Sequence, residues 1–157
     1  MMWGKLLAIL DNRKDKARLK EAKAKRELLK LMEDLDKKQK EIDTEQRKIE
    51  QEASEFWQKT EQGTLAGTEI KVSKAKINFI TEVKHGLMQE KETIVSDIRE
   101  KNMEIAKIQK EIKGISQKQE KYKFLLDKEA KEKSQKIEQF EEAQMAESST
   151  IRFGRVL

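Results

Sequence analysis

The sequence predicts an all-α protein, a long two-helix antiparallel coiled-coil hairpin, and three observations support this fold class. Charged residues make up 41% of the 157 residues and apolar residues only 36%, which is too few for a compact core. The chain contains no proline, the residue that kinks or breaks helices. Apolar residues recur with three- and four-residue spacing in both halves of the chain, as expected of coiled-coil helices.

The first helix is expected from about residue 3 to residue 61. Its seam, the row of positions that should face the other helix, follows a 4,3 spacing with one inserted four-residue step, a stutter, after Leu35. The seam positions are Trp3, Leu7, Leu10, Lys14, Ala17, Glu21, Ala24, Leu28, Leu31, Leu35, Gln39, Ile42, Gln46, Ile49, Ala53 and Phe56. Since many of these are small or polar, we expect a loose first helix, above all between residues 11 and 25.

A turn is expected at about residues 62–68. Gly63 suits the end of the first helix, because glycine adopts the left-handed conformation without steric cost. Thr68 suits the start of the second helix, where its hydroxyl can accept a hydrogen bond from a free backbone N–H. A connection this short requires the two helices to be antiparallel neighbours.

The second helix is expected from about residue 68 to residue 147, with a stronger seam. Its positions are Ile77, Ile80, Lys84, Leu87, Lys91, Ile94, Ile98, Lys101, Ile105, Ile108, Ile112, Ile115, Gln119, Tyr122 and Leu126, and after a second stutter Ala130, Lys133, Ile137 and Phe140. Folding about Leu65 places Trp3 near Leu126, so residues 127–147 should lack a partner within the chain. Residues 148–157, which contain Ser148, Ser149 and Thr150, are expected to be a flexible tail.

The sequence offers no pattern typical of a catalytic, cofactor or metal site, and we expect a protein that is not an enzyme. A two-helix hairpin has no concave pocket in which catalytic groups could converge. The single histidine, His85, is expected to be a solvated surface residue. The 35 basic and 30 acidic residues are intermingled, which argues against nucleic-acid binding. No segment is apolar and long enough to span a membrane, although residues 2–10 could form a surface anchor.

Two groups of residues outside the seams are candidate partner-binding sites. The first is an apolar edge near the turn, formed by Leu65, Val72, Phe79 and Val83. It is either broadened core packing or a docking surface. The second group combines aromatic residues with a basic segment, and its members are Trp3, Arg13, Lys14, Arg18, Lys25, Tyr122 and Phe124. Its basic residues form either a solvated helix face or a patch for an acidic partner.

Three segments give the chain a resemblance to a known family. Residues 5–13 (KLLAILDNR) resemble an opening Leu-Leu-x-x-Arg-type helix, which alanines follow among basic residues. Residues 118–126 (KQEKYKFLL) resemble a Lys-x-x-Lys-Tyr run, and residues 139–147 resemble an acidic, glutamine-containing ending. These features are similar to those of the stalk-like coiled-coil proteins of type III secretion systems, the YscO/SctO family, and of their flagellar counterpart FliJ.

The resemblance implies a central stalk that links a hexameric secretion ATPase to the cytoplasmic ring of the export gate and assists export chaperones. It implies that the ATPase binds the group of aromatic and basic residues and that the export gate binds Leu65, Val72, Phe79 and Val83. It also implies that the protein is located at the cytoplasmic face of a bacterial inner membrane. From the hairpin itself we expect a monomer. Two alternatives stay open: a general cytosolic scaffold or chaperone, and a membrane-surface protein anchored by residues 2–10.

Overall fold

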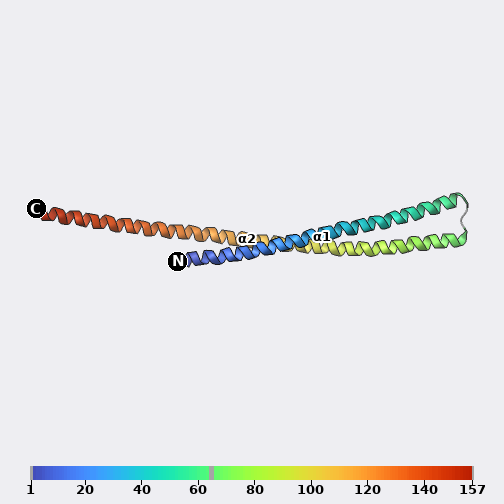
Figure 1. The fold of residues 1–157 in the computed structure, drawn as a ribbon, viewed down its shortest axis with the longest axis horizontal. Helices are drawn as coiled ribbons and strands as arrows, with labels where there is room; N and C mark the ends of the chain where they lie inside the picture. The colour runs from blue at the N-terminus through green and yellow to red at the C-terminus, as the bar shows by residue number, and fades with distance from the viewer. Residues whose placement is uncertain (1, 64–65, 157) are drawn as a thin grey trace. The chain divides into compact units, whose positions relative to one another are not determined.

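Two long helices form the protein, and they pack against each other as an all-α hairpin (Figure 1). Helix α1 comprises Met2–Glu61 and helix α2 comprises Gly67–Val156. The structure, a computed structural model, describes residues 2–63 and 66–156, and for residues 152–156 only the backbone. No strand occurs within these ranges. The fold class predicted from the sequence is therefore confirmed.

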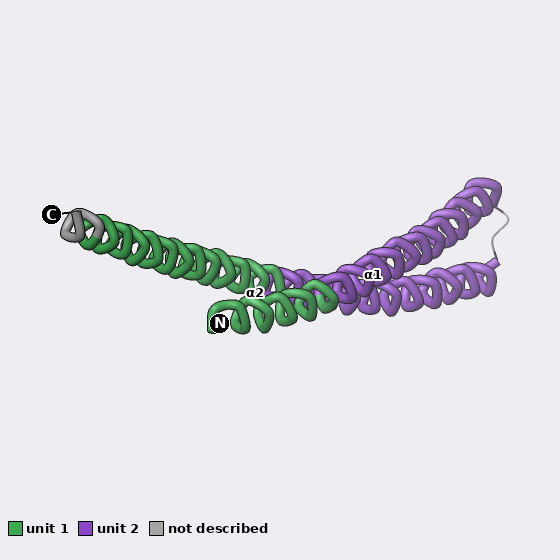
Figure 2. The backbone as a smooth tube through the Cα atoms, turned by 60° about the vertical axis from the view of Figure 1, so that its left-hand side comes forward, with its two compact units in different colours: residues 1–20, 108–157 green, residues 21–107 purple. Residues whose placement is uncertain are grey.

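The chain divides into two compact units, and both helices contribute to each (Figure 2). Unit 1 contains residues 1–20 and residues 108–157, and unit 2 contains residues 21–107. In unit 1 the beginning of α1 packs on the part of α2 that begins at Ile108, and in unit 2 the rest of α1 packs on the first part of α2. Each unit is therefore a pair of antiparallel helix segments with its own seam.

Both predicted seams are confirmed: every position predicted from Trp3 to Phe56, and every position from Ile77 to Leu126, is buried or half-buried. The most buried apolar residues are Ala17 in unit 1 and Ala24 in unit 2, each 3% exposed. The seam between residues 11 and 25 is thus closely packed, contrary to the looseness expected of it. Small side chains allow two helix backbones to approach each other, so an alanine at a seam position can be fully covered.

The end of α1 agrees with its prediction, and the start of α2 does not. Gly63 has a φ of 68°, and its N–H donates to the carbonyl oxygen of Thr60 at 3.1 Å, as in a Schellman-type helix end. At the start of α2, the N–H of Ile70 donates to the carbonyl oxygen of Ala66 at 3.2 Å. Ala66 is therefore the N-cap, and Thr68, predicted for that role, already lies within the first turn.

The predicted end of the second helix near residue 147 is also wrong, because α2 continues through residues 148–156. Serine and threonine lower helix stability by only a fraction of a kcal/mol each, so Ser148, Ser149 and Thr150 are too weak to stop a helix without proline. The hydroxyl of Thr150 donates to the carbonyl oxygen of Ala146 at 2.9 Å, which satisfies its side chain within the helix.

The predicted unpaired stretch of α2 is present in unit 1. From Ala130 to Ile151 every residue of α2 is exposed, whereas the residues between Ile108 and Leu126 include three buried and several half-buried seam positions. Within the part of the chain that the structure describes, residues 130–151 form a helix without a covering partner. We call residues 130–151 the bare stretch.

Candidate interaction surfaces

The aromatic residues predicted as a binding group are partly used inside unit 1. The rings of Trp3 and Tyr122 pack against each other with their centroids 5.4 Å apart and their planes tilted by 31°. Both side chains are half-buried. Phe124, two residues further along α2, is 66% exposed. The Trp3–Tyr122 pair therefore joins the two helix segments, and Phe124 is the aromatic member of the group that faces solvent.

A buried polar residue, Gln119, links the helices in unit 1. Its amide nitrogen donates to Oδ1 of Asp11 at 2.6 Å, and its amide oxygen accepts a hydrogen bond from Nζ of Lys14 at 3.3 Å. Buried amides need such partners, because an unsatisfied polar group costs about 1–3 kcal/mol. Lys14, predicted to bind a partner protein, is thus committed to a contact within the chain.

The other basic candidates differ in their surroundings. Arg13 and Arg18 belong to unit 1 and have exposed side chains. Lys25 belongs to unit 2, where its Nζ lies 2.8 Å from Oε1 of Glu21 on the preceding helical turn. The basic segment predicted as one patch is therefore divided between the two units, and Arg13 and Arg18 are its solvent-facing part in unit 1.

The predicted apolar edge of unit 2 is largely exposed. Val72, Phe79 and Val83 all lie at the surface of α2, and Phe79 is 67% exposed. We call these three residues the outer stripe; Leu65, predicted to join them, lies outside the described residues. Val72 and Phe79 are more than half exposed, which favours a docking surface over broadened core packing, whereas Val83 is 37% exposed and so mostly covered. The outer stripe is therefore an apolar surface that faces solvent chiefly at Val72 and Phe79.

One residue of the outer stripe, Val72, lines a shallow groove between the helices of unit 2. The groove is lined by Glu52, Glu55, Lys59, Thr68, Glu69, Val72, Ser73 and Lys76. Across it, the hydroxyl of Ser73 donates to Oε1 of Glu52 at 3.3 Å. Sequence reasoning missed one further aromatic side chain in this unit, Trp57, which is exposed and meets Phe56 edge to face at 6.0 Å. Trp57 directly follows the seam residue Phe56, and this off-seam position could have identified it as an exposed aromatic residue.

Polar side chains occupy several seam positions in unit 2, and they pair across the helices. Lys84 donates to Oε1 of Gln46, and Lys91 donates to Oε1 of Gln39, each at 2.6 Å. The two pairs are one heptad apart on both helices, so they repeat the same antiparallel arrangement. Such lysine–glutamine layers are satisfied only when the helices are in this register.

A third polar layer in unit 2 carries an ion pair. Nζ of Lys101 lies 2.6 Å from Oε2 of Glu27 on the other helix and 2.9 Å from Oε2 of Glu104. The hydrogen bond with Glu27, followed by that with Glu104, raises the pKa of Lys101 to about 12. The same hydrogen bond lowers the pKa of Glu27 below its ordinary value. Both groups are therefore charged throughout the neutral range.

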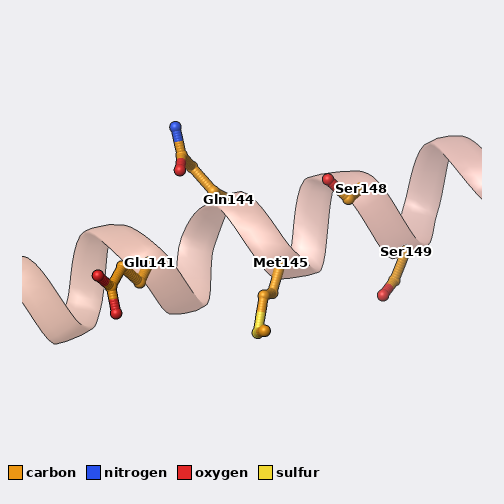
Figure 3. Close-up of a pocket in the computed structure, with 5 residues that line it drawn as sticks. All are labelled: Glu141, Gln144, Met145, Ser148 and Ser149. Carbon is orange, nitrogen blue, oxygen red and sulfur yellow. The ribbon is translucent and has the colours of Figure 1, made fainter.

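The bare stretch carries exposed apolar residues. Ile137, Phe140 and Met145 face solvent, and Ile137 is 59% exposed. Figure 3 shows a shallow hollow on this stretch in which Gln144 and Ser148 point to one side of the helix, and Glu141, Met145 and Ser149 to the other. The lining residues all come from α2, so the hollow is an open helix surface without a second wall.

The remaining candidate chemistry is sparse. Within residues 2–63 and 66–156, no group of histidine, cysteine, aspartate or glutamate residues could hold a metal ion. His85 is exposed, and its ring nitrogen Nε2 lies 3.4 Å from the side-chain amide nitrogen of Gln89. Neither helix, over its described length, is apolar enough to cross a membrane.

Comparisons with known proteins return nothing similar to this chain. No protein-family model, no curated protein and no solved structure matches it.

Proposed function

We propose that the chain is a non-enzymatic, stalk-like component of a type III secretion apparatus that links the hexameric export ATPase to the export gate. As part of the same proposal, the protein is located at the cytoplasmic face of a bacterial inner membrane. There it also assists export chaperones. The proposal rests on the resemblance of residues 5–13, 118–126 and 139–147, and on a hairpin architecture in which each unit has its own exposed surface.

The observation that carries the proposal is that each unit exposes a phenylalanine at a position outside the predicted seams. Phe79 in unit 2 is 67% exposed and Phe124 in unit 1 is 66% exposed. Aromatic side chains contribute strongly to protein–protein binding when a partner covers them. A linker between two machines requires two separate binding surfaces, and we assign the outer stripe to the export gate and Phe124, Arg13 and Arg18 to the ATPase.

A binding assay with two purified partners tests this assignment. Phe79→Ala should weaken binding to the cytoplasmic ring of the export gate about tenfold or more and leave ATPase binding unchanged, and Phe124→Ala should do the reverse. Both variants should keep the helicity of the parent chain, because neither side chain is buried. Met103→Ala, which also removes an exposed apolar side chain, is the control and should change neither affinity. Absence of binding to both partners would contradict the proposal.

A general scaffold or chaperone is the second candidate, because the same exposed apolar residues suit other protein partners. Genes that flank the coding sequence discriminate between the two, since a neighbouring hexameric ATPase gene supports the stalk.

The membrane-surface alternative is weakened by the packing of the first turns of α1. Trp3 and Leu7 are half-buried and Leu10 is buried, which leaves Met2 and Ile9 as the exposed large apolar residues there. Flotation with liposomes tests that alternative.

A further inference from the structure

We infer that the bare stretch of α2 pairs with the bare stretch of a second copy of this chain, in antiparallel orientation. The inference goes beyond the proposed function and does not depend on it. It also replaces the monomer expected from the sequence with a dimer in which the aromatic pair of unit 1 and the outer stripe of unit 2 lie outside the paired segment.

The first argument is continuity with the seam of unit 1. Up to Leu126 the seam of α2 is covered by α1, and beyond it the spacing continues through Ala130, Lys133, Ile137 and Phe140 with every side chain exposed. Two large apolar side chains that keep seam spacing on a bare helix form a narrow stripe, which is the pattern of a coiled-coil contact. The stripe therefore fits another long helix.

The second argument is charge, which selects both the occupant and its direction. Residues 127–136 contain four lysines among three acidic residues, whereas residues 137–147 contain four glutamates and no basic residue. A second copy in parallel orientation would set the four glutamates beside four glutamates. In antiparallel orientation the acidic half of each copy lies beside the lysine-bearing half of the other. The segment is thus complementary to itself only when reversed.

The third argument is the register that this pairing produces. If Ile137 of one copy packs beside Phe140 of the other, Lys133 comes to lie opposite Gln144 on both sides of the centre. Lysine–glutamine layers are already the polar contacts of this chain's own antiparallel seams: Lys84 with Gln46, Lys91 with Gln39 and Lys14 with Gln119. Gln144 points away from the side of the helix that carries Met145, so Met145 lies off the proposed seam (Figure 3).

The molar mass of the full-length chain in solution, followed by light scattering over roughly 1 to 200 µM, tests association. One chain has a mass of 18.4 kDa, and we expect the measured value to rise to about twice that with concentration. Ile137→Lys places a charge in the centre of the contact and should weaken association about tenfold or more. Met145→Lys adds the same charge off the seam and should leave association unchanged. A mass of one chain at every concentration would overturn the inference.

Cross-linking tests the orientation, and the absence of cysteine from the chain makes it unambiguous. Lys133→Cys and Gln144→Cys are prepared as separate variants that carry tags of different size. In antiparallel pairs, a disulfide should form between the two variants when they are mixed, and neither variant should form one alone. Disulfides within each variant alone would show a parallel pair and contradict the inference. Association that is lost in both Ile137→Lys and Met145→Lys would likewise contradict it, since the seam would then not be the contact.

Discussion

Two stretches of α2 in unit 1 have the same seam spacing and opposite environments. Between Ile108 and Leu126 the seam is covered by α1, and Ile115 is 8% exposed; in the bare stretch Ile137 is 59% exposed. Periodicity therefore marks a helix face that suits a partner, but it does not say which chain supplies that partner. In unit 1 the two stretches differ in their contact with α1, which packs beside α2 as far as the Trp3–Tyr122 contact, and the bare stretch lies beyond that contact.

The largest expected effect comes from truncating equivalent isoleucines in the two stretches. Ile115→Ala should lower the free energy of unfolding by about 2 kcal/mol, the low end for a buried isoleucine, because a two-helix seam can relax around the missing atoms. Ile137→Ala should change it by less than about 0.5 kcal/mol when the chain is dilute. Chemical denaturation followed by circular dichroism measures both. If the two variants lost equal free energy of unfolding, the stretch that α1 covers and the bare stretch would not differ in packing.

A smaller effect, of opposite sign, is expected at the polar layer of unit 1. Gln119→Leu should stabilise the chain by about 1 kcal/mol, because a polar seam residue fixes register at a cost in stability and its partners Asp11 and Lys14 can turn to water. Gln117→Leu, at an exposed position of the same turn, is the matched control and should have almost no effect. A marked loss of stability in Gln119→Leu would mean that the network stabilises unit 1 more than apolar packing could.

The turn offers a matched pair of glycines with opposite expected effects. Gly63→Ala forces a side chain into a φ of 68° and should destabilise the chain by about 1 kcal/mol. Gly67→Ala lies in the first turn of α2 with open space around the new Cβ, so it should be neutral or stabilise by up to about 1 kcal/mol. Thermal unfolding measures both, and a neutral Gly63→Ala would show that the left-handed helix end is dispensable.

The smallest effect is a pH dependence of the ion pair in unit 2. The pKa of Glu27 is lowered from 4.5, so the contribution of its contact with Lys101 is present above pH 4.5 and is lost as the pH falls through the folded-state value. The pKa of Lys101 is raised from 10.5 to about 12, so the contribution is present below pH 10.5 and is lost as the pH rises through about 12.

An NMR titration of the Glu27 carboxyl group checks this assignment. Lys101→Met should return the pKa of Glu27 toward 4.5, and Lys107→Met, at an exposed position six residues further on, should leave it lowered. If the pKa of Glu27 did not respond to Lys101→Met, the cross-helix hydrogen bond would not be its cause.

Much of the fold could be predicted from the sequence, because seam spacing depends only on helix geometry. The seams, and the helix end at Gly63, follow from apolar periodicity and from the conformational freedom of glycine. Two local predictions failed because weak preferences were given too much weight: Thr68 is not the N-cap, and the serines at 148 and 149 do not end α2. The close packing at Ala17 and Ala24 could not be inferred from residue size alone, since it depends on how nearly the two backbones approach.

The candidate surfaces were predictable only in part. Apolar residues off the seam, such as Phe79 and Phe124, could be recognised from their spacing, and both are exposed. Trp3 and Tyr122 could be placed near each other by folding the chain at its turn, although the fold-back about Leu65 placed Trp3 one helical turn away, near Leu126. The contacts of Lys14 and Lys25 within the chain depend on side-chain geometry, which periodicity does not contain.

Hydrogen exchange along α2 in dilute solution tests the contrast between covered and bare stretches most directly. Helical amides covered by a partner exchange only when the helices separate, whereas those of an isolated helix exchange through local fraying. We predict clearly slower exchange for residues 108–126 than for residues 130–151. Equal rates in the two stretches, or slower exchange in residues 130–151, would contradict the account.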